Sequence, residues 1–231
     1  MDDQTFDQKN ALEWINIIED EKARTRESDI YPKLKAWVGQ LGISEVLEIG
    51  CGQGVCSNHL ELSACNYTGV EPSSFLLERA KQLYAANNRK FTLGNAYRIP
   101  FLDGAFDAAF SVSVWHLLSN LKQAASELNR VLKAEGQFLI ITANPGAYSV
   151  WTSAYTETKT CERRFEGKLP NGLSDILYLY TLDEIMTSFE SAHLKVHSTE
   201  IFRPTADGQK MYVAIHGKKL SENKHHQSIP K

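Results

Sequence analysis

Residues 46–55 constrain the fold more than any other part of the chain. They begin with a short apolar run, pass through glycines at positions 50, 52 and 54, and continue into a segment of helical character. A buried parallel strand has such an apolar run. Glycines permit the left-handed backbone angles of a tight turn and the close approach of a ligand, and a helix that begins there offers unpaired N–H groups. The sequence therefore predicts a strand, a turn that borders a ligand pocket, and a helix over 55–62.

The glycine spacing separates two classes of ligand. A dinucleotide fingerprint has the form G-x-G-x-x-G. Counted from Gly50, it requires glycine at the position that Val55 occupies. Glu48 stands instead two residues before the first glycine. A carboxylate there repels a pyrophosphate but can hold the ammonium group of an amino acid. The alternative is a turn that binds no ligand.

Three segments resemble the class I S-adenosylmethionine-dependent methyltransferases, in particular the type that acts on small molecules. Residues 48–54 resemble motif I of that family, residues 103–118 resemble its fourth strand with the turn before it and a histidine after it, and residues 130–138 resemble the run that leads into its fifth strand. The resemblance covers most of residues 40–145. It implies S-adenosyl-L-methionine as the cofactor and S-adenosyl-L-homocysteine as the product. No motif requires a metal.

The resemblance also implies an α/β, Rossmann-like fold with a mostly parallel seven-stranded sheet, an antiparallel last strand and helices on both faces. Besides the first strand, apolar runs predict strands over 66–70, 90–93, 106–112, 137–141, 194–201 and 211–216. Helical periodicity and caps predict helices over 73–87, 122–132 and 181–192, the last with a capping box at its start. We expect a methyltransferase domain over 41–217 and a flexible tail over 218–231.

The N-terminal residues 1–40 are expected to form a helical lid. A helix over 5–26 would place Leu12, Ile15 and Ile18 on one apolar stripe. A second helix would follow over 28–38, ending at the glycines beyond it. In many methyltransferases of this family such helices fold over the cofactor, so Tyr31 is a candidate contact. The alternative is simple helix packing.

The resemblance assigns most cofactor contacts to strand ends. Glu71 closes the second strand and would accept both ribose hydroxyls, although it could also be an ordinary surface residue before Pro72. Asn95 stands where the family has an acid. Its amide can accept from the adenine amino group and donate to a ring nitrogen, or it can serve only as a turn residue. The expected cofactor-binding residues are Tyr31, Glu48, Gly50, Cys51, Gly52, Gly54, Glu71, Pro72, Asn95, Ala96, Ser111, Val112 and His116.

The end of the fourth strand is expected to face the reacting methyl group. Backbone groups near Ser111 and Val112 would face the methionine part of the cofactor, and Trp115 and His116 would lie beside the methyl. Because histidine titrates near neutral pH, His116 is the candidate catalytic base for a hydroxyl acceptor. The alternative is a histidine that packs above the sheet.

Residues 144–180 show no alternation of strands and helices and contain many aromatic and charged side chains. A long irregular insertion usually has a task, such as covering a binding site. We therefore expect 144–180 to cover the substrate, with Tyr148 and Trp151 joining Trp115 as substrate contacts. The alternative is a decorative or dimerising insertion.

Charge, hydropathy and cysteine usage narrow the functional classes. The net charge of −3 and scattered Lys and Arg residues show no basic face for a long nucleic acid, so a small-molecule acceptor is expected. No apolar run approaches the roughly 18 residues of a membrane span, and the acidic N-terminus is not a secretory signal. The four cysteines lack zinc spacing and indicate buried, reduced thiols. These features predict a cytoplasmic monomer or homodimer.

Two other functional classes remain open from the sequence. One is a methyltransferase that acts on RNA or protein, for which salt-sensitive activity would be evidence. The other is a non-catalytic S-adenosylmethionine-binding protein or a nucleotide-binding domain of another class. Titration with S-adenosylmethionine and with a nicotinamide dinucleotide separates these last two.

The assignment of Glu71 to the ribose can be tested directly. Replacing it in Glu71→Ala removes charge-assisted hydrogen bonds to the cofactor and should weaken S-adenosylmethionine binding by about 1.5–3 kcal/mol. Isothermal titration of the variant and the parent protein measures the difference. Unchanged affinity would contradict the assigned contact.

Overall fold

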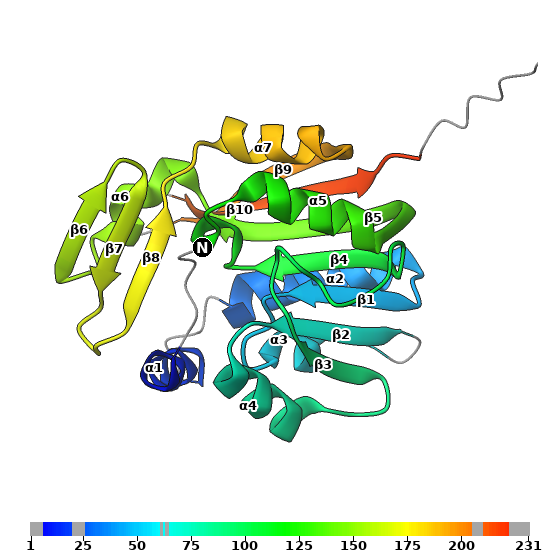
Figure 1. Ribbon diagram of the computed structural model, residues 1–231, viewed down its shortest axis with the longest axis horizontal. Helices are drawn as coiled ribbons and strands as arrows, with labels where there is room; N and C mark the ends of the chain where they lie inside the picture. Colours follow the sequence, from blue (N-terminus) through cyan, green and yellow to red (C-terminus); the bar gives the residue numbers. More distant parts are fainter. Residues whose placement is uncertain (1–6, 20–25, 61, 63–64, 205–209, 222–231) are drawn as a thin grey trace, which may run out of the picture.

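The computed structural model describes residues 7–19, 26–60, 62, 65–204 and 210–221. Its main feature is a seven-stranded sheet in the order β3-β2-β1-β4-β5-β10-β9 (Figure 1). Strand pairs from β3 to β5 are parallel, whereas β10 is antiparallel to both β5 and β9. The predicted sheet is therefore confirmed. The strands are β1 (Glu45–Ile49), β2 (Asn66–Glu71), β3 (Arg89–Leu93), β4 (Phe106–Val112), β5 (Leu132–Ala143), β9 (Leu194–Pro204) and β10 (Lys210–Lys219).

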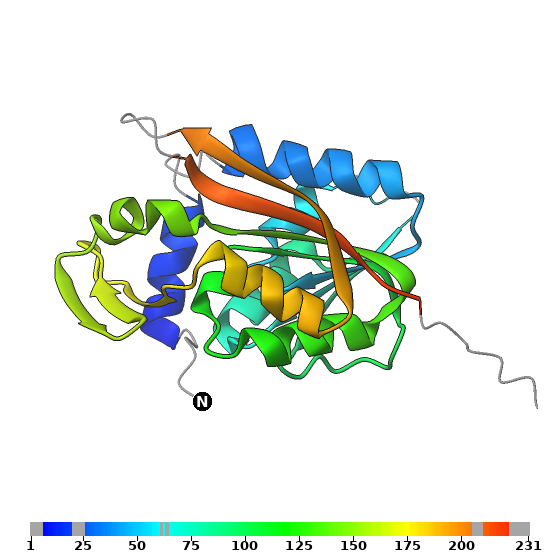
Figure 2. The ribbon, with the colours of Figure 1, turned by 90° about the horizontal axis from the view of Figure 1, so that it is seen from above.

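Helices cover both faces of the sheet because neighbouring strand residues point to opposite sides. Val46 belongs to the apolar cluster on the face of α2 (Tyr31–Leu41), α3 (Val55–His59) and α4 (Ser74–Tyr84). Leu47, the next residue, belongs to the cluster on the face of α5 (Leu121–Val131) and α7 (Leu182–Ser191). Figure 2 shows α2 on one side of the sheet and α5 with α7 on the other. A strand buried on both faces reads as a continuous apolar run, which is the pattern that predicts β1 and β4.

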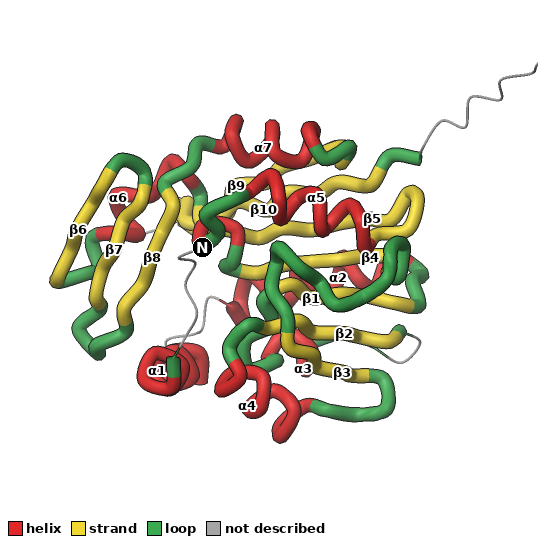
Figure 3. Tube along the Cα trace, viewed as in Figure 1, coloured by secondary structure: helices red, strands yellow, loops and turns green. Residues whose placement is uncertain are grey.

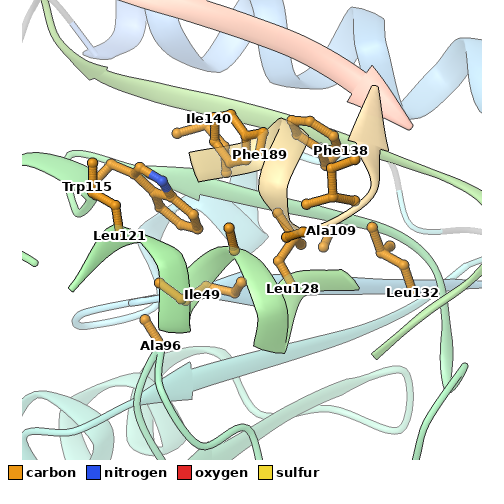
Figure 4. Packing of buried hydrophobic residues seen from close by; sticks show 14 of the residues in the cluster. Ile49, Ala96, Ala109, Trp115, Leu121, Leu128, Leu132, Phe138, Ile140 and Phe189 are labelled. Atoms are coloured by element: carbon orange, nitrogen blue, oxygen red, sulfur yellow. The ribbon is translucent and has the colours of Figure 1, made fainter. Parts of the chain in front are cut away.

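One of the two apolar clusters of the core lies between α5, α7 and the sheet (Figure 4). Leu128 of α5 and Phe189 of α7 are both fully buried. The ring centroid of Phe189 lies 5.1 Å from that of Phe138 on β5. At the start of α7, Thr181 and Glu184 form the predicted capping box.

The N-terminal helices are shorter than predicted or shifted. The first helix, α1, is Gln8–Glu19, and Arg26 already belongs to a π-helical turn, η2 (Arg26–Ile30). The rest of the predicted 5–26 helix lies outside the described residues. Leu12 is 54% exposed while Ala11 is buried, so the buried stripe of α1 is rotated from the predicted one. α2 continues to Leu41 and ends at Gly42, which has the left-handed φ of 58° that glycine adopts without strain.

The C-terminal boundaries also need correction. The predicted tail 218–231 begins too early, because Lys218 and Lys219 are part of β10. The Lys219 ammonium donates to the carbonyl oxygens of Asn129 and Leu132, at 2.9 and 3.0 Å, and so holds the strand end against α5. Residues 222–231 lie outside the described part. The predicted helix over 55–62 is also too long, because Leu60 has an extended backbone and α3 ends at His59.

The insertion 144–180 is regular, contrary to the prediction. It contains a short helix, α6 (Tyr148–Thr152), and a separate antiparallel sheet of β6 (Glu157–Cys161), β7 (Arg164–Lys168) and β8 (Ser174–Tyr178), seen in Figure 3. Glu162 and Gly172, with φ of 52° and 95°, lie in the connections between these strands. β6 is exposed along its whole length and β7 alternates between buried and partly exposed residues. Because at most one face of these strands is buried, they lack the continuous apolar run of the main sheet. That run is the pattern on which the strand predictions depend.

The thiols match their prediction only in part. Cys51, Cys56 and Cys65 are buried, whereas Cys161 on β6 is exposed. Among the described helices, none is long and apolar enough to cross a membrane.

A matched pair of substitutions tests the core. Leu128→Ala removes a fully buried side chain from α5 and should lower the free energy of unfolding by about 2–5 kcal/mol, because it leaves a cavity. Leu102→Ala makes the same chemical change at a side chain that is 84% exposed and should alter it by less than about 0.5 kcal/mol. Chemical denaturation of both variants gives the two values. Equal losses would show that α5 is not packed as described.

Candidate active site

A cavity of about 540 Å³ lies at the carboxyl ends of β1 and β4. These are neighbouring strands from which the chain continues in opposite directions across the sheet, the place where open α/β sheets bind ligands. Ile49 and Val112 line the cavity from the two strand ends, Trp14 lines it from α1 and Leu177 from β8. The volume falls in the rough 300–1,000 Å³ range of ligand sites.

The glycine turn shapes one wall of this cavity. Gly50 has φ of 73°, and a Cβ there would lie 2.4 Å from Cγ2 of Val114. Glycine is therefore required both for the backbone angle and for the close approach of Val114, in the loop that follows β4. Gly52 also lines the cavity, and its N–H donates to the Glu71 carboxylate at 2.9 Å.

Glu71 is buried at the end of β2 and faces the same cavity. One carboxylate oxygen accepts from Gly52 and the other accepts from the Ser73 N–H at 2.9 Å. Each oxygen keeps a lone pair for a further donor. Burial raises the pKa of the Glu71 carboxyl to about 7, against the lowering effect of the two backbone hydrogen bonds.

Glu48 lies on the other side of the turn. It lines a small adjoining cavity of about 40 Å³ together with Tyr31 and Cys51. The Tyr67 hydroxyl donates to the Glu48 carboxylate. Burial raises the pKa of Glu48 to about 7, and the Tyr67 hydrogen bond acts in the opposite direction. Gly52 and Val112 line both cavities, which makes the two spaces neighbours.

Arg26 was not predicted from the sequence, yet it lines both cavities. Its guanidinium lies 5.5 Å from the ring centroid of Trp14 and donates to the Ser113 hydroxyl over 3.4 Å. Arg26 lowers the pKa of Glu48 by its charge. The site thus presents a cation and an anion to the same small space. No local spacing indicates such a pairing, because Arg26 belongs to the turn before α2 and Glu48 to β1.

Asn95 lines the cavity, but its side chain is used differently from the prediction. The side-chain carbonyl oxygen accepts from the backbone N–H groups of Tyr97 and Arg98, at 2.9 and 3.0 Å. The amide oxygen therefore stabilises a turn, and the NH₂ group is left as the donor toward a ligand. Ala96 is buried beside it and also lines the cavity.

His116 lines the cavity, yet its geometry does not favour the predicted role of general base. Its Nδ1 lies 2.9 Å from the Thr142 hydroxyl and accepts from the Ala143 N–H over 3.3 Å. Burial, together with the charge of Arg26, lowers the pKa of His116 to about 3. The ring is neutral at physiological pH, and the nitrogen that carries its lone pair is already engaged.

Part of the chain matches one family model by its sequence. Residues 47–140, which include the glycine turn, Glu71 and His116, match the family model described as "Methyltransferase domain". By its sequence this part of the chain is a methyltransferase domain, and the sheet around it has the strand order of the class I S-adenosylmethionine-dependent methyltransferase fold. The chain is similar to the malonyl-[acyl-carrier protein] O-methyltransferase of Legionella pneumophila, at 32% identity over 48% of this chain and 40% of the relative. It is also similar to the fatty-acid O-methyltransferase of Mycolicibacterium smegmatis, at 32% identity over 43% of this chain and 37% of that protein.

The chain thus spans about two fifths of the length of the curated relatives it matches. Among solved structures, the PH0226 protein of Pyrococcus horikoshii has the same fold, with a TM-score of 0.73 over 88% of this chain and 93% of that one, at 18% identity. The fold is therefore shared well beyond the part whose sequence is recognisably similar.

The methyltransferase domain gathers most, but not all, of the predicted residues around its cavities. Gly54 packs against Ala80 and Phe91 instead, where a Cβ would come within 2.9 Å of either side chain. Ser111 is fully buried and its hydroxyl donates to the Ile49 carbonyl. The predicted residues that line a cavity are Tyr31, Glu48, Gly50, Cys51, Gly52, Glu71, Pro72, Asn95, Ala96, Val112, His116 and Trp151.

Two predicted substrate contacts do not line the cavity. Trp115 is 1% exposed and packs on Phe189 in the core, 5.8 Å between ring centroids, as Figure 4 shows. Tyr148 instead donates from its hydroxyl to the Tyr178 carbonyl. Trp151 does line the cavity, and its indole N–H donates to the Met211 carbonyl at 2.9 Å.

The part of the cavity away from the glycine turn is mostly apolar. Its walls come from α1, from the 3₁₀ turn η3 (Trp115–Leu117) with the residue after it, and from the segment 144–180. The sequence predicts few of these residues as cavity contacts. On α1, however, Trp14, Ile17 and Ile18 have the three- and four-residue spacing of one helix face, and this signal could have identified them. The apolar lining residues are Trp14, Ile17, Ile18, Leu117, Leu118, Trp151, Ala154, Leu169, Leu173 and Leu177.

The charged and hydrogen-bonding groups of the site fit S-adenosylmethionine. The small cavity offers Glu48 for an ammonium group and Arg26 for a carboxylate, and Glu71 keeps lone pairs for two hydroxyls. Asn95 offers its NH₂ group near Ala96, where an adenine would lie. Among the described residues, no cluster of His, Cys, Asp and Glu could hold a metal ion.

The two buried carboxyls predict how stability depends on pH. In the folded chain burial raises the pKa of Glu48 and Glu71 from 4.5 to about 7, so the folded state binds protons more tightly than the unfolded state. Their contribution to the free energy of unfolding is fully present below about pH 4.5 and is lost as the pH rises through about 7. Denaturation of the ligand-free protein at several pH values in this window measures the slope.

Two Glu→Gln variants isolate this effect. Glu71→Gln removes one of the raised carboxyls and should flatten the slope between about pH 5 and 7. Glu190→Gln, at an exposed position on α7, should leave the slope as it is in the parent protein. A Glu71→Gln slope identical to that of the parent would show that Glu71 does not hold its proton in this range.

Proposed function

We propose that this chain transfers a methyl group from S-adenosylmethionine to a small apolar molecule held under the segment 144–180. The observation that carries the proposal is the joint placement of two buried carboxylates, Glu48 and Glu71, on either side of the glycine turn, next to a cavity whose far part is apolar. A pyrophosphate would be repelled there. A ligand with an ammonium group at one end and a ribose in the middle matches the charges.

Each residue has a defined task in this proposal. Glu48 holds the ammonium group, Arg26 the carboxylate and Glu71 the ribose hydroxyls of the cofactor, while Asn95 donates to the adenine. When bound, S-adenosylmethionine supplies a methyl group that its positive sulfur already activates. The chain's own contribution is to orient the acceptor and to exclude water, which the apolar walls from α1 and β8 favour.

The lining supports an apolar acceptor. The relatives named above act, by their names, on a malonyl group carried by acyl-carrier protein and on a fatty acid. The sterol 24-C-methyltransferase ERG6B of Gibberella zeae is 26% identical over 71% of this chain and 43% of that protein. These acceptors share an acyl or hydrocarbon body, for which walls made by Leu117, Leu169 and Leu173 are suited.

The decisive experiment has two parts. Isothermal titration should show binding of S-adenosylmethionine and no binding of a nicotinamide dinucleotide. Incubation with libraries of apolar acceptors should then release S-adenosylhomocysteine. Binding without product from any library would indicate a non-catalytic binder, and salt-sensitive methylation of RNA or protein would replace the small-molecule proposal.

The role of Arg26 gives a sharper test. Arg26→Ala should weaken binding of S-adenosylmethionine about ten- to a hundredfold, because a charge-assisted pair with the cofactor carboxylate is lost. Methylthioadenosine, which lacks the amino-acid part, should bind the variant and the parent protein equally. Lys159→Ala removes an exposed cation on β6 and should change neither affinity. Equal weakening of both ligands by Arg26→Ala would mean that Arg26 acts only by packing.

A further inference from the structure

His116 presents one hydrogen-bond donor to the acceptor part of the cavity. The Ala143 N–H can only donate, so Nδ1 of His116, which lies 3.3 Å from it, must carry the lone pair. The neutral ring therefore bears its proton on Nε2, on the side of the ring away from Nδ1 and from β5. The side chain is 4% exposed and lines the cavity. Among the described residues, both hydrogen bonds found for the His116 ring involve Nδ1.

The surroundings keep His116 a donor and prevent it from acting as a base. Thr142 and Ala143 of β5 occupy Nδ1, and Trp151 lies over the ring at 5.7 Å between centroids. Arg26 is the charged group that acts on the ring, and with burial it lowers the pKa of His116 to about 3. A proton from a substrate hydroxyl would find no free lone pair on the His116 ring, because Nδ1 is engaged and Nε2 already carries a proton.

Two of the other titratable groups that line the cavity, Glu71 and Tyr155, are already engaged in hydrogen bonds. Glu71 accepts from the Gly52 N–H of the glycine turn and from the Ser73 N–H after β2. The Tyr155 hydroxyl donates to Asp175 at 2.7 Å, and burial raises the pKa of Tyr155 well above its ordinary value. Asp175, the acceptor of the Tyr155 hydrogen bond, lies on β8. It follows Ser174, whose N–H donates to the side chain of Asn10 on α1. Among the residues that the structure describes, the titratable ones that line this cavity are Arg26, Glu71, Tyr97, His116, Tyr155, Asp175 and Tyr212.

We propose that the acceptor is the carboxylate of an apolar molecule and that the Nε2–H of His116 orients it. This inference rests on the proposed methyl transfer. A carboxylate is ionised at neutral pH, so it needs a hydrogen-bond donor, which His116 provides, and no base. One carboxylate oxygen accepts from His116 while the other attacks the methyl carbon. The new C–O bond forms as the C–S⁺ bond breaks, the electron pair stays on sulfur, and a methyl ester and neutral S-adenosylhomocysteine result without any proton transfer.

The first test compares acceptors that differ only in the reacting group. A panel of apolar carboxylates, each paired with the alcohol and the amine of the same skeleton, is incubated with the protein and S-adenosylmethionine, and S-adenosylhomocysteine is measured. Turnover should be confined to the carboxylates. At saturating cofactor their rate should be flat between about pH 7.5 and 9, whereas an amine acceptor would give a rate that rises with pH.

The second test changes the donor. His116→Phe should lower kcat/KM for the carboxylate about ten- to a hundredfold, the value of one hydrogen bond to a charged group. His116→Gln, whose amide can place an N–H near the same point, should recover most of that loss. Titration with S-adenosylhomocysteine should give the same affinity for both variants and the parent protein, and their thermal melting should show that both are folded.

The outcomes separate the two proposals. Failure to bind S-adenosylmethionine would remove the proposed function itself. Cofactor binding with turnover only of alcohols or amines, or with no turnover across the panel, would overturn the carboxylate assignment and leave the cofactor site standing. His116→Phe with unchanged kinetics, or with cofactor affinity reduced as much as activity, would overturn the orienting role of His116.

Discussion

The Glu71 carboxylate holds together the two turns on which the candidate cofactor site depends. It accepts from the Gly52 N–H in the turn after β1 and from the Ser73 N–H after β2. Both donors are backbone groups, so the carboxylate determines where the glycine turn lies relative to the neighbouring strand. A buried charge is costly unless such donors stabilise it, and the pKa of Glu71, near 7, shows that burial outweighs the two hydrogen bonds. A ligand that supplies hydroxyl donors would complete this arrangement.

The acceptor side is built from segments that are distant in the sequence. The Ser174 N–H at the start of β8 donates to the Asn10 side chain of α1, and the Tyr180 hydroxyl after β8 donates to the Leu118 carbonyl after η3. These contacts bring the apolar side chains of α1, of η3 and of the segment 144–180 around the 540 Å³ cavity. Because the walls are apolar, a buried donor such as the His116 N–H has a large effect on which group can react there. Specificity in this site therefore depends on few polar atoms.

The predictable part of the site is the part that local sequence specifies. Glu48, Gly50 and Glu71 lie at the ends of strands that read as apolar runs, so their meeting at the sheet edge follows from the fold. Trp115 and His116 are adjacent, and both were expected beside the methyl. The 3₁₀ turn η3 directs one into the core and the other to the cavity. Spacing alone does not reveal which side of such a turn a residue faces.

By itself the sequence determined the α/β sheet, the glycine turn and the charge pattern that suits S-adenosylmethionine, because these depend on backbone preferences within short contiguous stretches. Only the tertiary structure placed Arg26 beside Glu48, made the segment 144–180 a small sheet of its own, and gave Nδ1 of His116 its partners on β5. Each of these results from packing between segments far apart in the chain. Their relative position is set by the filling of a common core, and no local pattern records it.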